Sequence, residues 1–275
     1  MKTCVITGAT SGIGIETALG LARHDFQIII LGRNKEKCDE LVRKITDQGG
    51  RAEYIICDLS LKKSIYAACE QIKKKFLCID LLINNAGMSS DRSMITSEGL
   101  DWIFVTNYLS QFILIRELLP LVKKSDDGRI INVSSKLHYK AEFDLERPDF
   151  QCCENKVLKS YNQSKLLINM MTFELAEREK DSANLSIVCV HPGVVNTGIM
   201  RDVSSLWMTA AVSIVKPFLL TPEQGAQTTL YAAMAPEAKG IKGQYLDEKK
   251  SYKMNKQVYN DWLRQKAWQY SESLL

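Results

Sequence analysis

The stretch "TCVITGATSGIG", residues 3–14, decides the fold class of this chain. Its first five residues are apolar or β-branched, which predicts a buried β-strand, and a helical pattern begins at about Ser11. A strand that runs through glycines into a helix brings backbone N–H groups and the positive end of the helix dipole against a phosphate. We therefore expect this turn to bind the pyrophosphate of a nucleotide; the alternative is a plain tight turn.

The three glycines of this turn have separate expected roles. Gly8 permits the turn, Gly12 permits close approach of the phosphate, and Gly14 lets the helix pack on the strand. Their spacing, Gly-x-x-x-Gly-x-Gly, differs from the Gly-x-Gly-x-x-Gly fingerprint of many dinucleotide-binding proteins. The spacing alone is weak evidence, so the prediction depends on the strand before the turn and the helix after it.

The same alternation of strand and helix continues along the chain. Short β-rich runs, among them "FQIIIL", "AEYIIC", "IDLLIN", "GRIINVSS" and "LSIVCVHPG", are separated by longer stretches of helical period. Near-continuous apolar strands joined by helices predict a parallel sheet covered on both faces, with right-handed crossovers. The expected fold class is α/β, with a single doubly wound, Rossmann-type domain over residues 1–275 and a mostly parallel seven-stranded sheet.

Three segments interrupt this pattern, at residues 89–98, 137–158 and 198–222. Each follows a predicted strand on the carboxyl side of the sheet, where open α/β folds bind their ligands. We expect a cofactor half at about residues 1–135. We expect a catalytic and substrate half at about residues 136–275, in which residues 198–222 form a lid.

Composition excludes several classes of protein. Apolar residues make up 45% of the 275 residues and charged residues 25%, as in an ordinary globular protein. The 36 basic and 32 acidic residues are scattered, so no nucleic-acid-binding stripe is expected. The eight cysteines include no Cys-x-x-Cys pair, which predicts no metal site and free thiols in a reducing compartment such as the cytoplasm. No stretch is expected to span a membrane.

Arg33 follows the second predicted strand in "IIILGRNKEK". At this point of a dinucleotide-binding fold, an acidic residue binds the ribose 2′-hydroxyl of NAD, whereas an arginine suits the 2′-phosphate of NADP. A guanidinium pairs with a phosphate through two hydrogen bonds. The sequence therefore favours NADP(H) over NAD(H); the alternative is a surface arginine without a ligand.

A second chemical signal lies in "KSYNQSKLLINMM", residues 159–171. Tyr161 and Lys165 are four positions apart, so on a helix their side chains lie on one face and can point into one pocket. Taken alone, this pair is more often a solvated lysine beside a half-buried tyrosine.

Four motifs in a fixed order carry a family resemblance. They are "TGATSGIG", "NNAG" at residues 84–87, "YNQSK" at residues 161–165 and "HPGVVNT" at residues 191–197. With them, the chain resembles the classical short-chain dehydrogenases/reductases from Lys2 to about Leu246. It is most similar to their retinol-dehydrogenase-like branch, through "RIINVSSKL" and "VKPFLLTPEQGAQTTLY".

The resemblance implies a catalytic set. Tyr161 would be the general acid/base that passes a proton to the carbonyl oxygen as hydride arrives from the nicotinamide. Lys165 would hold the nicotinamide ribose and, with the charge of oxidised nicotinamide, lower the pKa of Tyr161. Ser135 would donate a hydrogen bond to the substrate oxygen, with Ser134 the weaker candidate. Asn107 would help to position a water in the proton relay, unless it only caps backbone within a kinked helix.

The resemblance also implies a set of cofactor contacts. They come from the glycine-rich turn, the ends of the second and third strands, and the other three motifs. These residues are Gly8, Thr10, Ser11, Gly12, Ile13, Gly14, Arg33, Asn34, Asp58, Leu59, Asn84, Ala86, Gly87, Tyr161, Lys165, Pro192, Gly193, Val195 and Thr197. His191, which precedes the last group, is expected to be structural.

Two further segments bear on the substrate. Tyr161 lies 26 positions after Ser135, so residues between them must loop out beside the mouth of the site. The adjacent pair Cys152–Cys153 in that loop has no evident activating partner, so a redox role is not expected. Residues 203–220 are too apolar for a freely solvated lid. They are expected to face a lipophilic substrate, an oligomer partner or a membrane surface, in this order of preference.

The leading functional hypothesis is an NADP(H)-dependent carbonyl reductase or alcohol dehydrogenase that acts on an apolar aldehyde, ketone or alcohol. The alternative is a non-catalytic NADPH-binding sensor or scaffold protein, because fold alone does not determine function. The complete set of Ser135, Tyr161 and Lys165 favours the enzyme, since a sensor has no chemical need for it. By resemblance, a homodimer or homotetramer is expected, built through the long helix of residues 100–123 and the helix that carries Tyr161.

Overall fold

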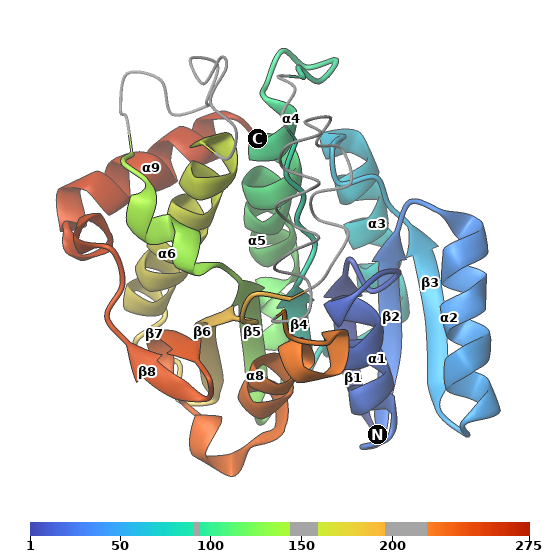
Figure 1. The fold of residues 1–275 in the computed structure, drawn as a ribbon. Coiled ribbons are helices and arrows are strands. Elements are labelled where there is room, and N and C mark those ends of the chain that lie inside the picture. The colour runs from blue at the N-terminus through green and yellow to red at the C-terminus, as the bar shows by residue number, and fades with distance from the viewer. Residues whose placement is uncertain (91–93, 144–158, 196–218) are drawn as a thin grey trace.

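One eight-stranded sheet organises the computed structural model, which describes residues 1–90, 94–143, 159–195 and 219–275 (Figure 1). The order of the strands is β3-β2-β1-β4-β5-β6-β7-β8, and all neighbours pair in parallel except β7 and β8. The strands are β1 (Lys2–Thr7), β2 (Phe26–Gly32), β3 (Arg51–Ile56), β4 (Leu81–Asn84), β5 (Gly128–Val133), β6 (Leu185–His191), β7 (Lys242–Asp247) and β8 (Lys250–Tyr252). The predicted α/β, doubly wound, mostly parallel architecture is confirmed.

The strand that the prediction omits is β8, which has three residues and pairs antiparallel to β7. The turn between them places Glu248 and Lys249 at φ of 48° and 65°. Two-residue hairpin turns with positive φ usually contain Asn-Gly or Asp-Gly, which makes them recognisable in a sequence. Because this turn uses Glu-Lys, the hairpin leaves no recognisable signal in the sequence.

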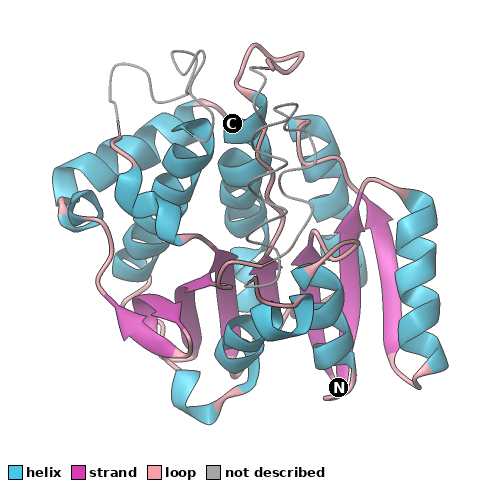
Figure 2. Cartoon of the chain, viewed as in Figure 1, coloured by secondary structure: helices cyan, strands magenta, loops and turns pink. Residues whose placement is uncertain are grey.

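Helices cover both faces of the sheet (Figure 2). One face carries α1, α2 and α8, and the other carries α3, α5, α6 and α9. Their bounds are α1 (Ile13–Ala22), α2 (Lys35–Asp47), α3 (Lys62–Lys75), α5 (Ser110–Val122), α6 (Lys159–Arg178), α8 (Pro222–Met234) and α9 (Asp261–Ser273). The core is therefore divided by the sheet into two layers.

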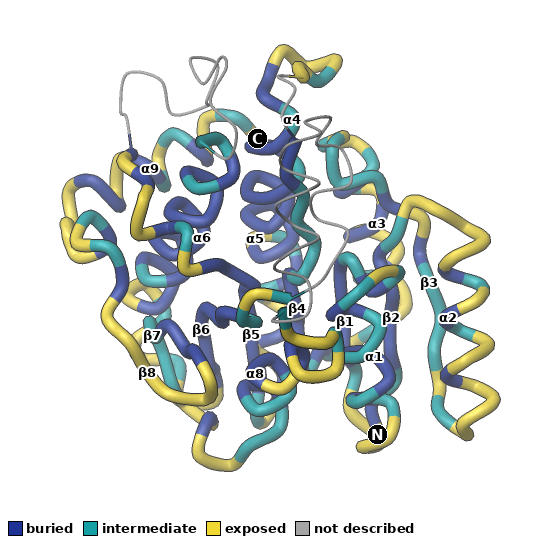
Figure 3. The backbone as a smooth tube through the Cα atoms, viewed as in Figure 1, coloured by how far each residue is buried: buried dark blue, intermediate teal, exposed yellow. Residues whose placement is uncertain are grey.

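Successive side chains along each strand point to opposite faces of the sheet, so each strand contributes to both core layers. In β1, Val5 packs into the layer under α3, α5 and α6, whereas Cys4 and Ile6 pack into the layer under α1 and α2. All three side chains are fully buried, and Figure 3 shows the central strands as the most buried part of the fold. A strand whose two faces are both covered has no polar side, which explains the near-continuous apolar runs in the sequence.

The long helix predicted for residues 100–123 is not uniform. It begins as α4 (Trp102–Phe104), where the Asp101 side chain accepts a hydrogen bond from the Phe104 N–H. It continues through a π-helical turn, η1 (Val105–Leu109), into α5. π-Turns inside α-helices are rare and often lie at functional sites. This one contains Asn107, so the helix departs from regular α-helical geometry at this residue.

The C-terminal helix α9 packs against α5 and α6, the two helices expected to form an oligomer interface. The Trp268 ring meets the ring of Phe112 on α5 edge-on, with centroids 4.8 Å apart, and the Arg178 guanidinium of α6 lies 4.4 Å from the Trp268 centroid. Tyr108 and Ser271 share a buried hydrogen bond of 2.6 Å. A second copy of the chain would therefore meet α9 over part of this face, and the homo-oligomer stays a prediction.

Trp268→Ala is expected to lower the free energy of unfolding by about 3 kcal/mol, since it removes a packed ring from between α5 and α6. Urea unfolding monitored by circular dichroism measures this loss. Trp262→Ala is the matched control: that ring on the same helix is 58% exposed, so its removal is expected to cost less than about 0.5 kcal/mol. Equal losses in the two variants would contradict the packing assigned to Trp268.

The structure bears on the predicted absence of a metal site and of a membrane-spanning helix only within the described residues. Their cysteines are free, and no cluster of potential metal ligands occurs among them. None of their helices is both long enough and apolar enough to cross a bilayer. Cys152, Cys153 and nearly all of the expected lid lie outside the described residues.

Candidate active site

A cavity of about 430 Å³ opens at the carboxyl ends of the strands, where the order reverses between β1 and β4. This switch point is where doubly wound folds bind nucleotides. Most of the predicted cofactor residues line it. They are Gly8, Thr10, Ser11, Gly12, Ile13, Gly14, Arg33, Asn34, Asp58, Leu59, Ala86, Gly87, Tyr161, Lys165 and Pro192.

The glycine-rich turn forms one wall of the cavity. Gly8 and Gly12 adopt φ of 66° and 49°, a region that favours glycine. A Cβ on Gly8 would lie 2.7 Å from the Ala86 Cα, and one on Gly14 would lie 2.1 Å from the Gly8 carbonyl oxygen. No side chain caps the N-terminus of α1. The turn leaves room for a phosphate group close to the backbone, and its role in phosphate binding stays a prediction.

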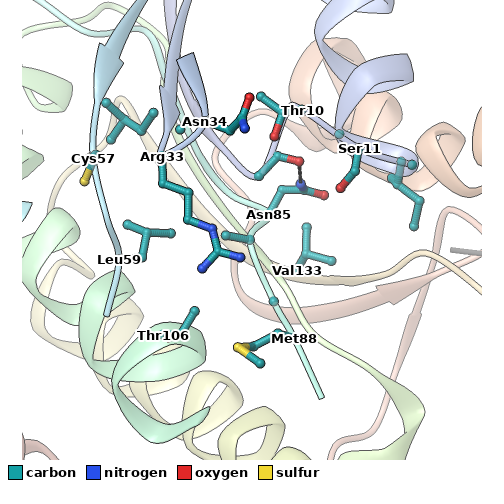
Figure 4. A pocket seen from close by; sticks show the side chains of 18 of the residues that line it. Thr10, Ser11, Arg33, Asn34, Cys57, Leu59, Asn85, Met88, Thr106 and Val133 are labelled. Carbon is teal, nitrogen blue, oxygen red and sulfur yellow. Dashed lines mark hydrogen bonds between the residues drawn. The ribbon is translucent and has the colours of Figure 1, made fainter. Parts of the chain in front are cut away.

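Arg33 reaches into the cavity from the end of β2 (Figure 4). Its side chain lies between Leu59 and Asn85 in this view. Asn34 caps α2 by accepting a hydrogen bond from the Lys37 N–H, at 2.8 Å. Lys37 also lines the cavity, so two basic residues stand at this end of it.

Asp58 and Leu59 continue the wall after β3. The Asp58 carboxylate accepts hydrogen bonds from the backbone N–H and the hydroxyl of Ser60, at 2.9 and 2.7 Å. The Asp58 N–H donates to the Ser64 hydroxyl at 2.9 Å. These bonds fix the loop beside Arg33. The loop thus presents the Leu59 side chain to the same end of the cavity.

In the "NNAG" motif, the structure differs from the prediction for Asn84. Its side chain is fully buried and donates to Asn132 on β5, at 2.8 Å, instead of lining the cavity. Its neighbour Asn85 lines the cavity and donates to the carbonyls of Thr7 and Gly8, at 3.0 and 3.1 Å. Side chains alternate along an extended chain, so the two asparagines point to opposite sides.

Ser135 stands near enough to Tyr161 for its hydroxyl to favour the ionised phenol. Tyr161 is 7% exposed, and burial raises the pKa of its phenol to about 12, against the smaller opposing effect of Ser135. The lowering of this pKa that the resemblance implies for Lys165 and oxidised nicotinamide stays a prediction. Tyr161 therefore holds its proton at neutral pH.

Lys165 lies in the same pocket, with its ammonium 5.4 Å from the centroid of the Tyr161 ring. It donates a 2.8 Å hydrogen bond to the Val133 carbonyl and sits under Gly87, where a Cβ would approach the ammonium to 3.3 Å. Burial lowers the pKa of Lys165 to about 8. This value leaves the side chain largely protonated at pH 7.

Asn107 does not line the cavity but is fully buried behind it. Its side-chain amide accepts from the Met88 N–H and donates to the Met88 carbonyl, both at 2.8 Å, and it donates to Ser164 at 3.1 Å. The side chain thus ties the loop after β4 to α6, beside Tyr161 and Lys165. This geometry supports the backbone-holding role, and the water relay stays a prediction.

The two serines after β5 have different partners. The Ser134 hydroxyl donates to the Lys165 carbonyl at 3.3 Å, whereas the Ser135 hydroxyl accepts the Leu137 N–H at 3.2 Å and favours the ionised form of the Tyr161 phenol. Ser134 lines the cavity, and Ser135, with 9% exposure, is not among the lining residues. The effect on Tyr161 supports Ser135 as the candidate catalytic serine.

The segment after β6 is only partly where the sequence predicts it. Pro192 lines the cavity, but Gly193 and Val195 do not. They turn toward Leu220: a Cβ on Gly193 would lie 2.3 Å from the Leu220 Cδ1, and Val195 forms an isolated β-bridge with Leu220. Thr197 lies outside the described residues.

His191 is buried at the end of β6, with 4% exposure, which agrees with a structural role. Burial lowers the pKa of His191 from 6.5 to about 4. The folded state therefore excludes a proton that the unfolded state binds, and stability present above pH 6.5 is lost as the pH falls toward 4. The loss from this group approaches about 3 kcal/mol.

We expect His191→Asn to flatten the fall in unfolding free energy between pH 6.5 and 4, because asparagine does not titrate. Urea unfolding at half-unit pH steps measures this. His24→Asn, at an exposed position, is expected to leave the pH profile of the wild type unchanged. If His191→Asn keeps the wild-type slope, His191 is not the group that titrates.

Sequence reasoning missed several residues of the cavity wall. Asn85 was within a recognised motif, and Lys37 follows Arg33 by one helical turn, so both had a usable signal. The others are next to predicted residues at strand ends or after the "NNAG" motif, or lie on the helix of residues 100–123. They are Leu31, Gly32, Cys57, Met88, Trp102, Thr106 and Val133.

Known proteins are similar to this chain in sequence and in fold. The model of the short chain dehydrogenase family matches residues 2–146. Human polyprenol dehydrogenase is 35% identical over 280 residues, which cover 97% of this chain and 83% of that protein. Human retinol dehydrogenase 14 is 32% identical over 291 residues, which cover 100% of this chain and 86% of that protein.

Two solved structures with this fold contain a bound nicotinamide cofactor. One is described as an NAD(P)-dependent gluconate 5-dehydrogenase from Beutenbergia cavernae with bound NADP; it has a TM-score of 0.71, 25% identity, and coverage of 90% of this chain and 94% of that one. The other is 3-ketoacyl-(acyl-carrier-protein) reductase from Brucella melitensis with NADH, at a TM-score of 0.69, 26% identity, and coverage of 90% and 96%. The chain belongs to the short-chain dehydrogenase family, and it is a nicotinamide-dependent oxidoreductase of the type that interconverts alcohols and carbonyl compounds.

Proposed function

We propose that this chain is an NADP(H)-dependent oxidoreductase that interconverts an apolar carbonyl compound and its alcohol, with Tyr161 as the general acid/base. The observation that carries the proposal is the joint placement of Tyr161 and the Lys165 ammonium in the cavity, with Ser135 near the Tyr161 phenol. Arg33 stands in the same cavity, at the end of β2.

The cavity suits a nicotinamide dinucleotide, which supplies or accepts the hydride when bound. Tyr161 gives its proton to the oxygen of the carbonyl compound, and takes it back when an alcohol is oxidised. Ser135 donates a hydrogen bond that stabilises the charge forming on that oxygen. The Lys165 ammonium stabilises the phenolate left behind.

The preference for NADP(H) rests on charge. Arg33 and Lys37 both line the end of the cavity where the 2′-phosphate would lie, and the carboxylate of Asp58 is engaged by Ser60. A guanidinium and an ammonium attract a phosphate that a carboxylate in the place of Arg33 would repel.

An apolar substrate is supported by the names of the relatives, which are polyprenol and retinol dehydrogenases. Both names denote alcohols with long hydrocarbon parts. Residues 203–220 are expected to face a lipophilic substrate, an oligomer partner or a membrane surface, and all but the last two lie outside the described residues. The support therefore comes from the relatives. A cytoplasmic location stays a prediction.

The test follows NADPH or NADH absorbance with a panel of aliphatic, aromatic and isoprenoid aldehydes and ketones. We expect turnover that is faster with NADPH and fastest with the isoprenoid compounds. Turnover of small polar substrates only would overturn the substrate class. Binding of NADPH without turnover of any compound would instead favour the sensor alternative.

A further inference from the structure

The segment after β5 holds Ser135 through an unusual set of hydrogen bonds. Ser135 precedes the short 3₁₀ helix η2 (Lys136–Lys140), and its hydroxyl accepts the Leu137 N–H at 3.2 Å. Its backbone carbonyl accepts two bonds from one residue, His138: the backbone N–H at 3.1 Å and the ring Nδ1–H at 2.6 Å. The shorter of the two comes from the ring.

His138 is buried among aromatic rings, where a histidine that served only to fill space would be less stable than an apolar side chain. The ring is fully buried, with the Tyr139 and Tyr245 rings 4.0 and 4.8 Å away between centroids. Burial lowers the pKa of His138, so the ring is neutral. With its proton on Nδ1, Nε2 is left as an acceptor that finds no partner among the described residues.

An unpartnered buried polar atom carries a desolvation cost that a phenyl ring in the same place would avoid. The Tyr245 hydroxyl beside it is also buried without a partner in the described part of the chain. The polarity of His138 therefore has to be explained by the one bond that the ring makes, to the Ser135 carbonyl.

Other contacts hold the outer part of η2 independently of this ring. The Asn255 amide donates to the carbonyls of His138 and Ala141, at 3.1 and 3.0 Å. Lys136 forms a 2.6 Å ion pair with the buried Asp247. A variant that lacks only the Nδ1–H group should therefore keep η2 in place and fold.

We propose that His138 is a positioning residue that sets the Ser135 peptide so that the Ser135 hydroxyl meets Tyr161. The proposal rests on the proposed function, in which Ser135 and Tyr161 act together on the substrate oxygen. Without the ring donor, the Ser135 carbonyl keeps only the longer bond from the His138 N–H, the peptide between Ser135 and Lys136 is held less firmly, and the Ser135 hydroxyl moves away from Tyr161.

The kinetic test compares two variants of His138. His138→Phe keeps a planar ring and removes the donor; it is expected to lower kcat about 10- to 100-fold, with KM for NADPH unchanged. His138→Asn places an amide N–H near the position of Nδ1 and is expected to restore most of the activity. His24→Phe is the matched control, because His24 makes the same kind of Nδ1 contact to the Gly20 carbonyl, at 2.9 Å, on the exposed part of the chain.

A double-mutant comparison separates positioning from general damage. In a Ser135→Ala background, His138→Phe is expected to cost no further activity, because the group that His138 positions is already gone. Additive losses would mean that His138 supports the fold generally, and would overturn the proposal.

A third measurement does not depend on turnover. Crystal structures of the wild type, His138→Phe and His138→Asn are expected to show Ser135 Oγ within hydrogen-bond distance of Tyr161 Oη in the first and third only. If Ser135 stays on Tyr161 in His138→Phe, the proposal fails whatever the activity. If the wild type turns over no substrate, the proposed function fails, and this structural result still decides the role of His138.

Nitrogen-15 NMR of the wild type covers the case in which His138→Phe does not fold. The proposal expects a neutral His138 ring with its proton on Nδ1. A proton on Nε2 would overturn it, because that ring could not donate to the Ser135 carbonyl.

Discussion

Tyr161→Phe is expected to reduce carbonyl turnover by about 10²- to 10⁴-fold while cofactor affinity stays unchanged. The substitution removes only the phenolic oxygen, which lies in the buried pocket with Ser135 and the Lys165 ammonium. The remaining ring still fills the space beside α6, so the fold should survive. Initial rates of NADPH oxidation and a fluorescence titration with NADPH measure the two quantities separately.

The matched control is Tyr108→Phe. Tyr108 is a second buried tyrosine whose phenol is bonded to Ser271, and it does not line the cavity. We expect that variant to lose some stability and to keep wild-type turnover. If Tyr161→Phe retains more than about a tenth of the wild-type rate, which is less than the loss of a general acid costs, another group supplies the proton.

The direction of reaction adds a pH signature to the same experiment. Reduction requires the protonated phenol, which burial favours by raising the pKa of Tyr161 to about 12 without cofactor. Oxidation of the alcohol requires the phenolate instead. We therefore expect kcat for oxidation to rise with pH in the wild type, and no such rise in the residual activity of Tyr161→Phe.

Arg33→Asp is expected to weaken NADPH binding by about 10- to 100-fold and to reduce the preference over NADH accordingly. The variant removes a charge-assisted bond to the 2′-phosphate, worth about 1.5–3 kcal/mol, and adds a repelling carboxylate. NADH lacks that phosphate, so its dissociation constant should stay the same or fall. Calorimetric titrations of both cofactors at two salt concentrations measure the change.

Arg43→Asp makes the same change of charge on the exposed face of α2, away from the cavity. We expect it to leave the NADPH dissociation constant unchanged at physiological salt, where charges beyond about 8 Å are screened. Equal losses for NADPH and NADH in Arg33→Asp would indicate a damaged pocket. They would contradict the recognition of the 2′-phosphate by Arg33.

The Tyr161 and Arg33 predictions were both accessible from the sequence because local rules place these residues. An i,i+4 pair on a helix shares a face, and a residue that follows β2 lies at the carboxyl edge of the sheet. The same rules predicted the glycine-rich turn, whose close contacts at Gly8 and Gly14 leave no room for a side chain. Period and spacing are enough for contacts of this kind.

Asn84 and Asn85 show where such rules stop. Both stand in the same motif, but only the register of β4 against β5 determines which side chain bonds Asn132 in the core and which faces the cavity. The sequence likewise does not indicate β8, because the Glu-Lys turn before it carries no hairpin signal. These features depend on pairing between strands distant in sequence.

The sequence by itself determined the α/β class, the phosphate-binding turn and the identity of the candidate catalytic set, since each follows from local periodicity or a contiguous motif. The tertiary structure alone decided that Asn84 points away from the cavity, that α9 covers α5 and α6, and that burial dominates the pKa of Tyr161. It alone also buried the His138 ring beside Tyr245 and placed Asn255 on the His138 carbonyl. Burial and long-range contact are properties of the packed chain, and no local pattern encodes them.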